Sequence, residues 1–203
     1  MKNLIITIGR QLGSGGRSVG KLLAEHYGIS LYDKALINLA AEQSGLGKEF
    51  FTNADEHVSR SSLRSLITSR GLISSHSNSP LSNDALFQVQ SDVIRELAGK
   101  ESCIILGRCA DYILRDNPGL ISIFLSADKE DRLKRIAEHD NISIEKARTL
   151  MEQGDKKRAT YYNYYTDGVW GSASTYHLCI NTSVLGIEGT TQFLIQYIDS
   201  RNK

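Results

Sequence analysis

The sequence predicts an α/β fold, a three-layer sandwich in which helices cover both faces of a five-stranded parallel sheet. Short runs rich in β-branched residues alternate with longer segments whose apolar residues recur at helical spacing. The short runs are continuously apolar rather than alternating with polar residues, which is typical of strands buried on both faces. With 203 residues, 40% of them apolar, the chain can bury a substantial core.

The first part of the chain reads as strand, glycine loop, helix, strand and helix. Residues 4–8 form a β-branched run that predicts the first strand, and apolar residues at helical spacing over 19–27 predict the first helix. Gly28 follows that helix as a C-cap, because glycine readily adopts the left-handed conformation that ends helices. Residues 29–32 predict a short second strand, and residues 34–43 predict the next helix.

A polar, serine-rich segment over residues 45–83 interrupts this pattern, and we interpret it as a mobile lobe within a single domain whose core is 1–44 and 84–203. Asp84 is placed to cap the helix that follows the lobe. The remaining elements are predicted in this order: strand 103–106, strand 121–125, helix 128–139, helix 143–158, strand 178–181 and helix 187–199.

Composition and charge exclude several classes of protein. The formal net charge is +1, so no global field attracts nucleic acid or an anionic membrane. The apolar run at residues 4–8 is too short for a signal-peptide core or a membrane span, so we expect a cytoplasmic protein. Cys103, Cys109 and Cys179 form no C-x-x-C pair and are predicted to be reduced and buried, and the histidines show no metal-ligand spacing.

The glycine-rich segment 9–18 lies directly between the first strand and the first helix. A phosphate cradle needs successive N–H groups turned inward, which glycine permits through positive φ, and a helix N-terminus adds further donors. Both conditions are met, so the segment predicts a P-loop for the phosphates of a nucleoside triphosphate. The predicted phosphate contacts are Gly13, Ser14, Gly15, Gly16, Arg17 and Ser18.

This loop departs from the strict pattern G-x-x-x-x-G-K-[S/T]. Anchoring the pattern on Ser18 places Gln11 at its first glycine and Arg17 at its lysine. Arginine keeps the positive charge and adds a bidentate fork, but it is bulkier than lysine. Ser18 keeps the hydroxyl expected to meet Mg²⁺. Arg10 is either a second phosphate contact or a solvated side chain.

Several separate motifs resemble, in the same order along nearly the whole chain, those of the cytidylate kinase-like family, distant relatives of bacterial cytidylate kinases. The motifs are Gly9-Arg10-Gln11, Gly13-Ser14-Gly15-Gly16-Arg17, Leu31-Tyr32-Asp33-Lys34, Gly107-Arg108-Cys109-Ala110-Asp111, Tyr161-Tyr162, Trp170-Gly171, Cys179-Ile180-Asn181-Thr182 and Leu185-Gly186-Ile187-Glu188. The resemblance implies a P-loop kinase core, an acceptor-binding lobe at 45–83 and a lid around 128–170. It also implies ATP as phosphoryl donor, Mg²⁺ and a small phosphorylated acceptor.

The same resemblance assigns roles outside the loop. Asp33 falls close to the acceptor phosphoryl, and Arg108 falls where an arginine holds the acceptor phosphate. Arg132 falls among arginines that contact the transferring phosphoryl, while Asp155 and Arg158 correspond to an aspartate-arginine pair on the acceptor. The predicted set of catalytic cations is Arg17, Arg132 and Arg158. Phosphoryl transfer requires mainly positioning and positive charge, so arginines from different segments support these roles independently.

Some of these residues also have structural interpretations. Asp33 would cap the helix that begins at residue 34. Arg132 and Arg135 would form an ordinary charged helix face beside two acidic residues. The tyrosine run 161–165 is interpreted as lid packing or a homodimer contact rather than a base-stacking platform.

One departure from the family pattern leaves the acceptor open. Bacterial cytidylate kinases carry an aspartate on each side of the glycine-arginine pair, whereas Leu106 and Cys109 stand here and Asp111 is displaced by two residues. The acceptor is therefore either a nucleoside monophosphate, such as a cytidylate, or another small phosphorylated molecule. A nucleotide-binding sensor or subunit with weak catalysis on the same fold is the alternative from a different functional class.

Overall fold

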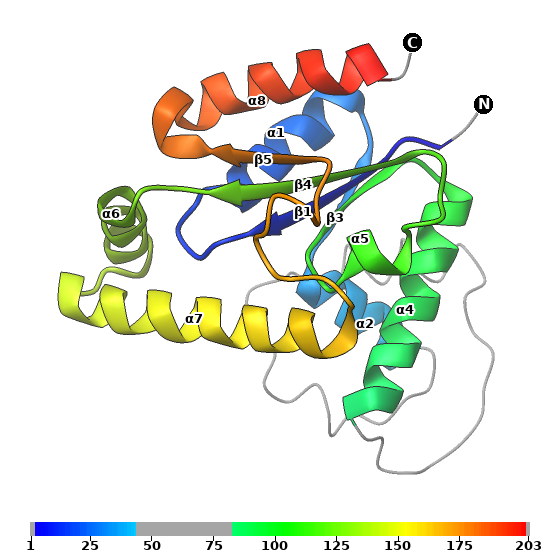
Figure 1. Ribbon diagram of the computed structural model, residues 1–203, viewed down its shortest axis with the longest axis horizontal. Helices are drawn as coiled ribbons and strands as arrows, with labels where there is room; N and C mark the ends of the chain where they lie inside the picture. Colours follow the sequence, from blue (N-terminus) through cyan, green and yellow to red (C-terminus); the bar gives the residue numbers. More distant parts are fainter. Residues whose placement is uncertain (1–2, 44–82, 202–203) are drawn as a thin grey trace.

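The computed structural model describes residues 3–43 and 83–201. Within this part of the chain, five parallel strands form one sheet in the order β2-β3-β1-β4-β5 (Figure 1). The strands are β1 Ile5–Arg10, β2 Ser30–Tyr32, β3 Cys103–Leu106, β4 Leu120–Ser126 and β5 Leu178–Asn181. The predicted α/β class with a five-stranded parallel sheet is confirmed. Because β1 is central, the segment that follows it leaves the sheet in the middle of its carboxyl edge.

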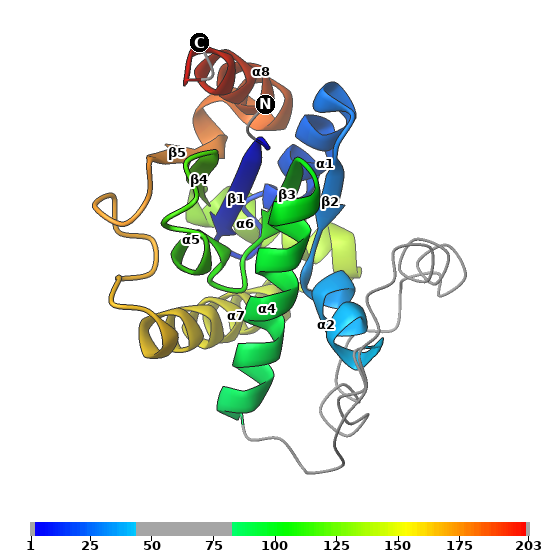
Figure 2. The same cartoon turned by 90° about the vertical axis from the view of Figure 1, so that its right-hand side faces the viewer.

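Helices form the outer layers of the sandwich, as Figure 2 shows from the side. They are α1 Gly16–Tyr27, α2 Lys34–Gln43, α4 Asn83–Lys100, α5 Ala110–Ile113, α6 Lys129–Asp140, α7 Ile144–Tyr165 and α8 Thr182–Arg201. Within residues 3–43 and 83–201, no helix has the length and apolar character needed to cross a membrane.

One face of the sheet is covered by α1 and α8. Val19 and Leu23 of α1 and Leu194 of α8 are fully buried and belong to one cluster with Ile6 and Ile8 of β1. Consecutive residues of a strand point to opposite faces, so the residues between them face the other layer. Each face therefore has its own apolar core.

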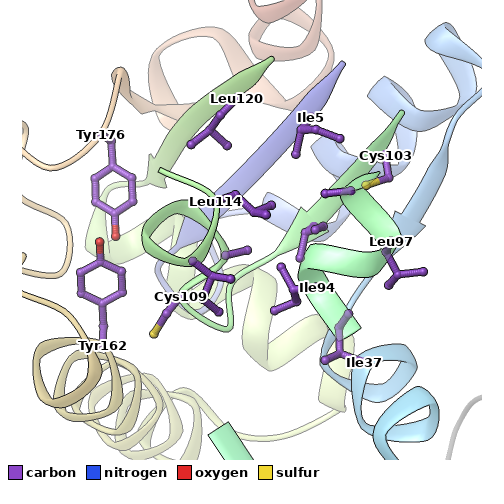
Figure 3. Packing of buried hydrophobic residues seen from close by; sticks show 14 of the residues in the cluster. Ile5, Ile37, Ile94, Leu97, Cys103, Cys109, Leu114, Leu120, Tyr162 and Tyr176 are labelled. Atoms are coloured by element: carbon purple, nitrogen blue, oxygen red, sulfur yellow. The ribbon is translucent and has the colours of Figure 1, made fainter. Parts of the chain in front are cut away.

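The second face is covered by α2, α4 and α5. In Figure 3, Ile37 of α2 and Ile94 of α4 lie beneath the strand residues Ile5 and Cys103, in one buried cluster. The same cluster extends to aromatic residues from α7 and the segment before β5. A third, smaller cluster joins α6 to α7. The apolar contacts thus hold α7 against both the sheet layer and α6.

Most predicted boundaries agree with the structure. Gly28 has φ of +63° and donates its N–H to the carbonyl of Ala24, as a left-handed C-cap does. The α7 helix continues to Tyr165 rather than ending at residue 158, because three of the four tyrosines, Tyr161, Tyr162 and Tyr165, pack against the core from one side of the helix. The short helix α5 was not predicted, since four residues give no periodic signal.

Two further differences concern the end of the chain. The last helix begins at Thr182 and is kinked at Gly186, where φ is +68°, so its first turn precedes the predicted start at residue 187. The prediction that Cys179 is buried is wrong: the residue is exposed, because β5 is an edge strand. Cys103 and Cys109 are buried and free, as predicted. The predicted lobe 45–83 lies outside the described residues, except for Asn83 at the start of α4.

Candidate functional site

The glycine loop lies between β1 and α1, and two of its glycines adopt a conformation that other residues rarely take. Gly13 and Gly15 both have φ of +78°, and Gly15 is the N-cap of α1. A Cβ on Gly13 would lie 2.7 Å from the carbonyl oxygen of Arg132, and one on Gly15 would collide with Ile187. The loop is therefore packed against α6 and α8, and the helix N-terminus follows it directly.

Side chains from distant segments fix the loop backbone. The buried Ser14 hydroxyl donates to the carbonyl of Gln11 at 2.9 Å, so this side chain stabilises the loop itself. Thr182 donates from Oγ1 to the Ser14 carbonyl at 2.8 Å. Arg135 donates from Nη1 to Thr182 Oγ1 at 3.2 Å and to the Gly13 carbonyl at 3.3 Å. These bonds satisfy the carbonyl groups of the loop and leave its shape well defined.

Two of the predicted ligand contacts, Arg132 and Asp155, also hold the loop backbone. Arg132 and Asp155 form an ion pair, with side chains 8% and 19% exposed. Arg132 Nε donates to the Leu12 carbonyl at 2.7 Å, and the Leu12 N–H donates to Asp155 Oδ1 at 2.8 Å. The structure therefore brings these two residues to each other and to the loop backbone.

Arg17 and Ser18 lie in the first turn of α1 and are both exposed. The Arg17 side chain is 74% exposed, and its Nη2 lies 3.0 Å from Asp33 Oδ2. Asp33 also caps α2, because its Oδ1 accepts the N–H groups of Ala35 and Leu36 at 3.0 and 3.1 Å. Asp33 therefore fits both of its interpretations, as a helix cap and as a carboxylate beside the glycine loop.

A cavity of about 670 Å³ opens in front of the loop. Its lining includes the glycine loop, the first turn of α1, Asp33 and part of α6. Gly13, Gly15, Arg17 and Ser18 all line it, so four of the six predicted phosphate contacts face one space. We call this space the loop cavity.

A second cavity of about 430 Å³ lies on the α7 side, and we call it the inner cavity. Its lining includes five cationic side chains: Arg10, Lys34, Arg108, Lys157 and Arg158. Among the described residues, its single lining carboxylate is Asp111. A cavity with such an excess of positive charge is suited to a ligand that carries several negative charges.

Arg108 enters the inner cavity from a strained turn. Gly107, Arg108 and Cys109 have φ values of +70°, +58° and +57°, and a residue other than glycine is strained in this region. Arg108 donates from Nη2 to the Tyr161 hydroxyl at 2.8 Å and to Gln90, and its guanidinium lies 4.3 Å from the centre of the Tyr161 ring. The buried Nε has no hydrogen-bond partner within the described residues. The turn thus aims a guanidinium that keeps an unused donor.

Arg10 and Arg158 form the wall between the two cavities. Arg158 donates from Nη1 to the Arg10 carbonyl at 3.0 Å. Both arginines line both cavities, as do Lys34 and Leu106. Burial lowers the pKa of Arg10 to about 9, with a further contribution from the Arg158 charge, and burial also lowers the pKa of Arg158. The two spaces therefore meet at a pair of partly desolvated guanidinium groups.

The far end of the inner cavity is aromatic and acidic. Tyr162 donates its hydroxyl to Asp111 at 2.5 Å. Burial raises the pKa of Asp111 above its usual value. The Tyr176 side chain is buried, and its hydroxyl faces that of Tyr162 (Figure 3). This end can offer hydrogen bonds to the uncharged part of a ligand.

Sequence reasoning left some of these residues aside. Lys34 and Lys157 carried no predicted role, and the role of Arg10 was left open. Arg10 does carry the signal that identified Arg108, a basic residue at the carboxyl end of a buried strand, where open α/β sheets bind ligands. Lys34 stands two residues after β2, as Arg108 stands two residues after β3, so it carries the same signal, whereas Lys157 lies inside α7 and does not.

The site can supply oxygen ligands for Mg²⁺ alongside a nucleotide. Within residues 3–43 and 83–201, no three His, Cys, Asp or Glu side chains gather as they would around a metal held by protein alone. Mg²⁺ usually keeps several waters and binds one or two protein oxygens together with phosphates. The Ser18 hydroxyl and the Asp33 carboxylate both line the loop cavity and fit that requirement.

Comparisons with known proteins cover almost the whole chain. Residues 5–184 match the model of the cytidylate kinase-like family. The chain is 30% identical to cytidylate kinase from Methanococcus vannielii, covering 92% of this chain and 94% of that protein. It is 27% identical to cytidylate kinase from Pyrococcus horikoshii, covering 97% and 88% of the two chains.

Solved structures share the fold. An uncharacterized protein from Eubacterium ventriosum has a TM-score of 0.74 and 34% identity, with 98% of this chain and 99% of that chain covered. A shikimate kinase from Bacteroides thetaiotaomicron has a TM-score of 0.53 and 15% identity, over 97% and 98% of the two chains. At that identity, the second comparison supports the fold alone.

Proposed function

The chain belongs to the cytidylate kinase-like family, and on that premise we propose that it transfers the γ-phosphoryl group of ATP to a nucleoside monophosphate or another small phosphorylated acceptor. In this reaction an oxygen of the acceptor phosphate attacks the γ-phosphorus, the bond from the γ-phosphorus to the β–γ bridging oxygen breaks, and ADP leaves. The attacking oxygen of a monophosphate is already deprotonated near neutral pH. The protein therefore has to position two anions and stabilise their charge.

The observation that carries this proposal is that the loop cavity and the inner cavity share a cationic wall. Arg10, Lys34 and Arg158 line both spaces, so anions bound in each would meet at these side chains. Two phosphorylated substrates repel one another, and cations between them offset that repulsion. A protein that binds one nucleotide alone has no need of the second cationic cavity.

In the loop cavity we assign the donor. Gly13, Gly15 and the first turn of α1 offer backbone N–H groups to the ATP phosphates, and exposed Arg17 contacts the outer oxygens of those phosphates. Ser14 supports the loop through its own hydrogen bonds to Gln11. Ser18 and Asp33 offer oxygens to Mg²⁺, which would neutralise part of the phosphate charge when bound.

In the inner cavity we assign the acceptor. Arg108 binds the acceptor phosphate through a guanidinium that is already oriented by Tyr161, and Arg158 contacts it from α7. Asp33 lines the loop cavity and is followed by Lys34, which lines both cavities, so we assign it a place close to the acceptor phosphoryl. Arg132 and Asp155 act through the loop backbone and bring α6 and α7, the proposed lid around 128–170, onto the donor site. The proposed acceptor lobe is 45–83.

Product analysis with a panel of acceptors tests the function. The protein is incubated with ATP, Mg²⁺ and, separately, each common nucleoside monophosphate and several sugar phosphates, and the products are separated by ion-exchange chromatography. We expect ADP to form together with a phosphorylated form of one acceptor class. ATP binding without transfer to any acceptor would instead support a nucleotide-binding sensor or subunit.

A further inference from the structure

Arg10 differs from every other cation of the site in how its side chain is accommodated. Its Cβ and Cγ lie against Gly16, where an added Cβ would be 2.8 Å from Arg10 Cβ and 3.0 Å from Cγ. Its Nη1 lies against Gly107, where an added Cβ would collide with it. The side chain therefore crosses from the start of α1 to the turn after β3, through space that two glycines leave open.

No residue of 3–43 or 83–201 serves the Arg10 guanidinium as a counterion of its own. Within the described residues it forms no ion pair and no side-chain hydrogen bond, whereas Arg17 pairs with Asp33 and Arg132 pairs with Asp155. The charge of Asp33 raises the pKa of Arg10. The charges of Arg158, Arg108 and Arg17 lower it. A partly buried charge without a partner is unfavourable, so the described part of the fold gives no structural reason to keep Arg10.

The position of Arg10 also answers a question that the sequence raised about the missing lysine. Gly15 is the N-cap and Gly16 the first residue of α1, so Arg17 is the second helical residue and its side chain extends into solvent. The space beside Gly16 is filled instead by the stem of Arg10. The cationic side chain beside the start of α1 therefore comes from Arg10 of β1 and not from a residue of α1.

Building on the proposed phosphoryl transfer, we propose that Arg10 is the cation that contacts the transferring phosphoryl group and takes the place of the P-loop lysine. Arg10 lines both cavities, so its guanidinium can contact oxygens of the donor and of the acceptor at once. Near neutral pH the guanidinium is protonated, and it moves no proton. Its role is to stabilise the negative charge on the equatorial oxygens as the phosphorus passes from one oxygen to the other.

The test compares Arg10→Met, Arg10→Lys and Arg17→Met, with Arg95→Met as a surface control because Arg95 forms an exposed pair with Asp92 of the same helix. For Arg10→Met we expect kcat to fall at least about 100-fold, while the unfolding temperature of the ligand-free protein stays the same or rises. A structural role would instead lower that temperature. For Arg17→Met we expect mainly a raised KM for ATP. Arg10→Met with kcat within threefold of wild type would overturn the proposal.

The conservative variant Arg10→Lys should also change how kcat depends on pH. A lysine at position 10 would meet the same burial and the same neighbouring cations, which lower the pKa of a cationic group. Because the ordinary pKa of lysine is lower than that of arginine, we expect Arg10→Lys to retain part of kcat at pH 7 and to lose it at a lower pH than the wild type does. A pH profile parallel to that of wild type would contradict the contact.

Binding of inorganic tripolyphosphate separates this inference from the proposed function, because it requires no acceptor. We expect calorimetry to show that Arg10→Met weakens tripolyphosphate binding at least about tenfold, and Arg95→Met less than twofold. If the wild type transfers phosphoryl to no acceptor, the proposed function fails, and tripolyphosphate affinity still decides whether Arg10 is the central anion contact. Unchanged affinity in Arg10→Met would overturn that assignment.

A second variant tests the path of the side chain without touching Arg10. Gly16→Ala should displace the Arg10 stem and lower kcat about tenfold or more, although alanine favours helix. Gly99→Ala in α4 is the matched control, because a Cβ there meets nothing within 4 Å. Gly16→Ala with the activity of Gly99→Ala would show that Arg10 does not depend on this space.

Discussion

The two sides of the glycine loop use arginine in opposite ways. On the α6 side, Arg132 is bonded to a carboxylate and to a loop carbonyl, so its charge is balanced within the protein. On the α7 side, Arg10, Arg108 and Arg158 line a cavity whose single described carboxylate lies at its far end. The difference teaches that the burial of an arginine does not identify its role. Whether its charge is balanced by the protein or left for a ligand is more informative.

The largest expected effect on stability comes from removing the ion pair between Arg132 and Asp155. Arg132→Met should destabilise the protein by about 3 kcal/mol, because it leaves Asp155 largely buried without its partner. Urea unfolding measures the change, and Arg148→Met on the exposed surface of α7 is the control. A loss below about 1 kcal/mol would mean that water replaces the guanidinium and that the comparison between the two sides is wrong.

Arg108→Ala tests the unbalanced side. We expect the KM for the acceptor to rise about ten- to a hundredfold, since a charged hydrogen bond contributes roughly 1.5–3 kcal/mol. The affinity for ATP should change little, because Arg108 lines the inner cavity and not the loop cavity. Steady-state kinetics with each substrate varied in turn measures both. An equal loss of ATP affinity would place Arg108 in the donor site.

The pH dependence of stability tests whether Asp111, the described carboxylate of the inner cavity, is balanced by the cations there. Its pKa is raised in the fold, so the native protein binds more protons than the unfolded chain, and stability falls as the pH rises through the folded pKa. Asp111→Asn keeps an oxygen that can accept from Tyr162 but removes this dependence. We expect the variant to unfold at a higher temperature than wild type at pH 8 and at a similar temperature near pH 4. The reverse order would show that the cationic end of the cavity stabilises the carboxylate.

The smallest expected effect on stability is at Arg17. Its pair with Asp33 is exposed on the arginine side, and such pairs contribute less than about 1 kcal/mol. Arg17→Ala should therefore shift the urea midpoint only slightly while it weakens ATP binding. A destabilisation as large as that of Arg132→Met would mean that the charge of Arg17, like that of Arg132, is balanced by a carboxylate of the protein.

The sequence predicted the fold well because the core strands carry their own signal. The β3 run is continuously apolar, and its predicted limits match those observed, as do those of α2 and β5. The end of α7 was harder to predict, because tyrosines favour helix only weakly and contacts with α4 and the segment before β5 decide the outcome.

The site was predictable only in part, for a geometric reason. The loop glycines and Arg108 were found because they follow strands directly. The ion pair between Arg132 and Asp155 joins two helices, and its residues are 23 positions apart in the sequence. The space for the Arg10 side chain depends on the glycines at positions 16 and 107. No local pattern links such distant positions, so the sequence alone could not separate a balanced charge from an unbalanced one.

The bonds that hold the glycine loop come from residues that are synthesised much later. Leu12 is held by Arg132 and Asp155, 120 and 143 residues further along, and Ser14 by Thr182, 168 residues further along. On the ribosome the loop is therefore exposed long before these partners exist. Because long-range contacts form late and close large loops, a nascent chain that ends before Thr182 should not hold ATP. The capacity to bind nucleotide then arises only as synthesis nears its end.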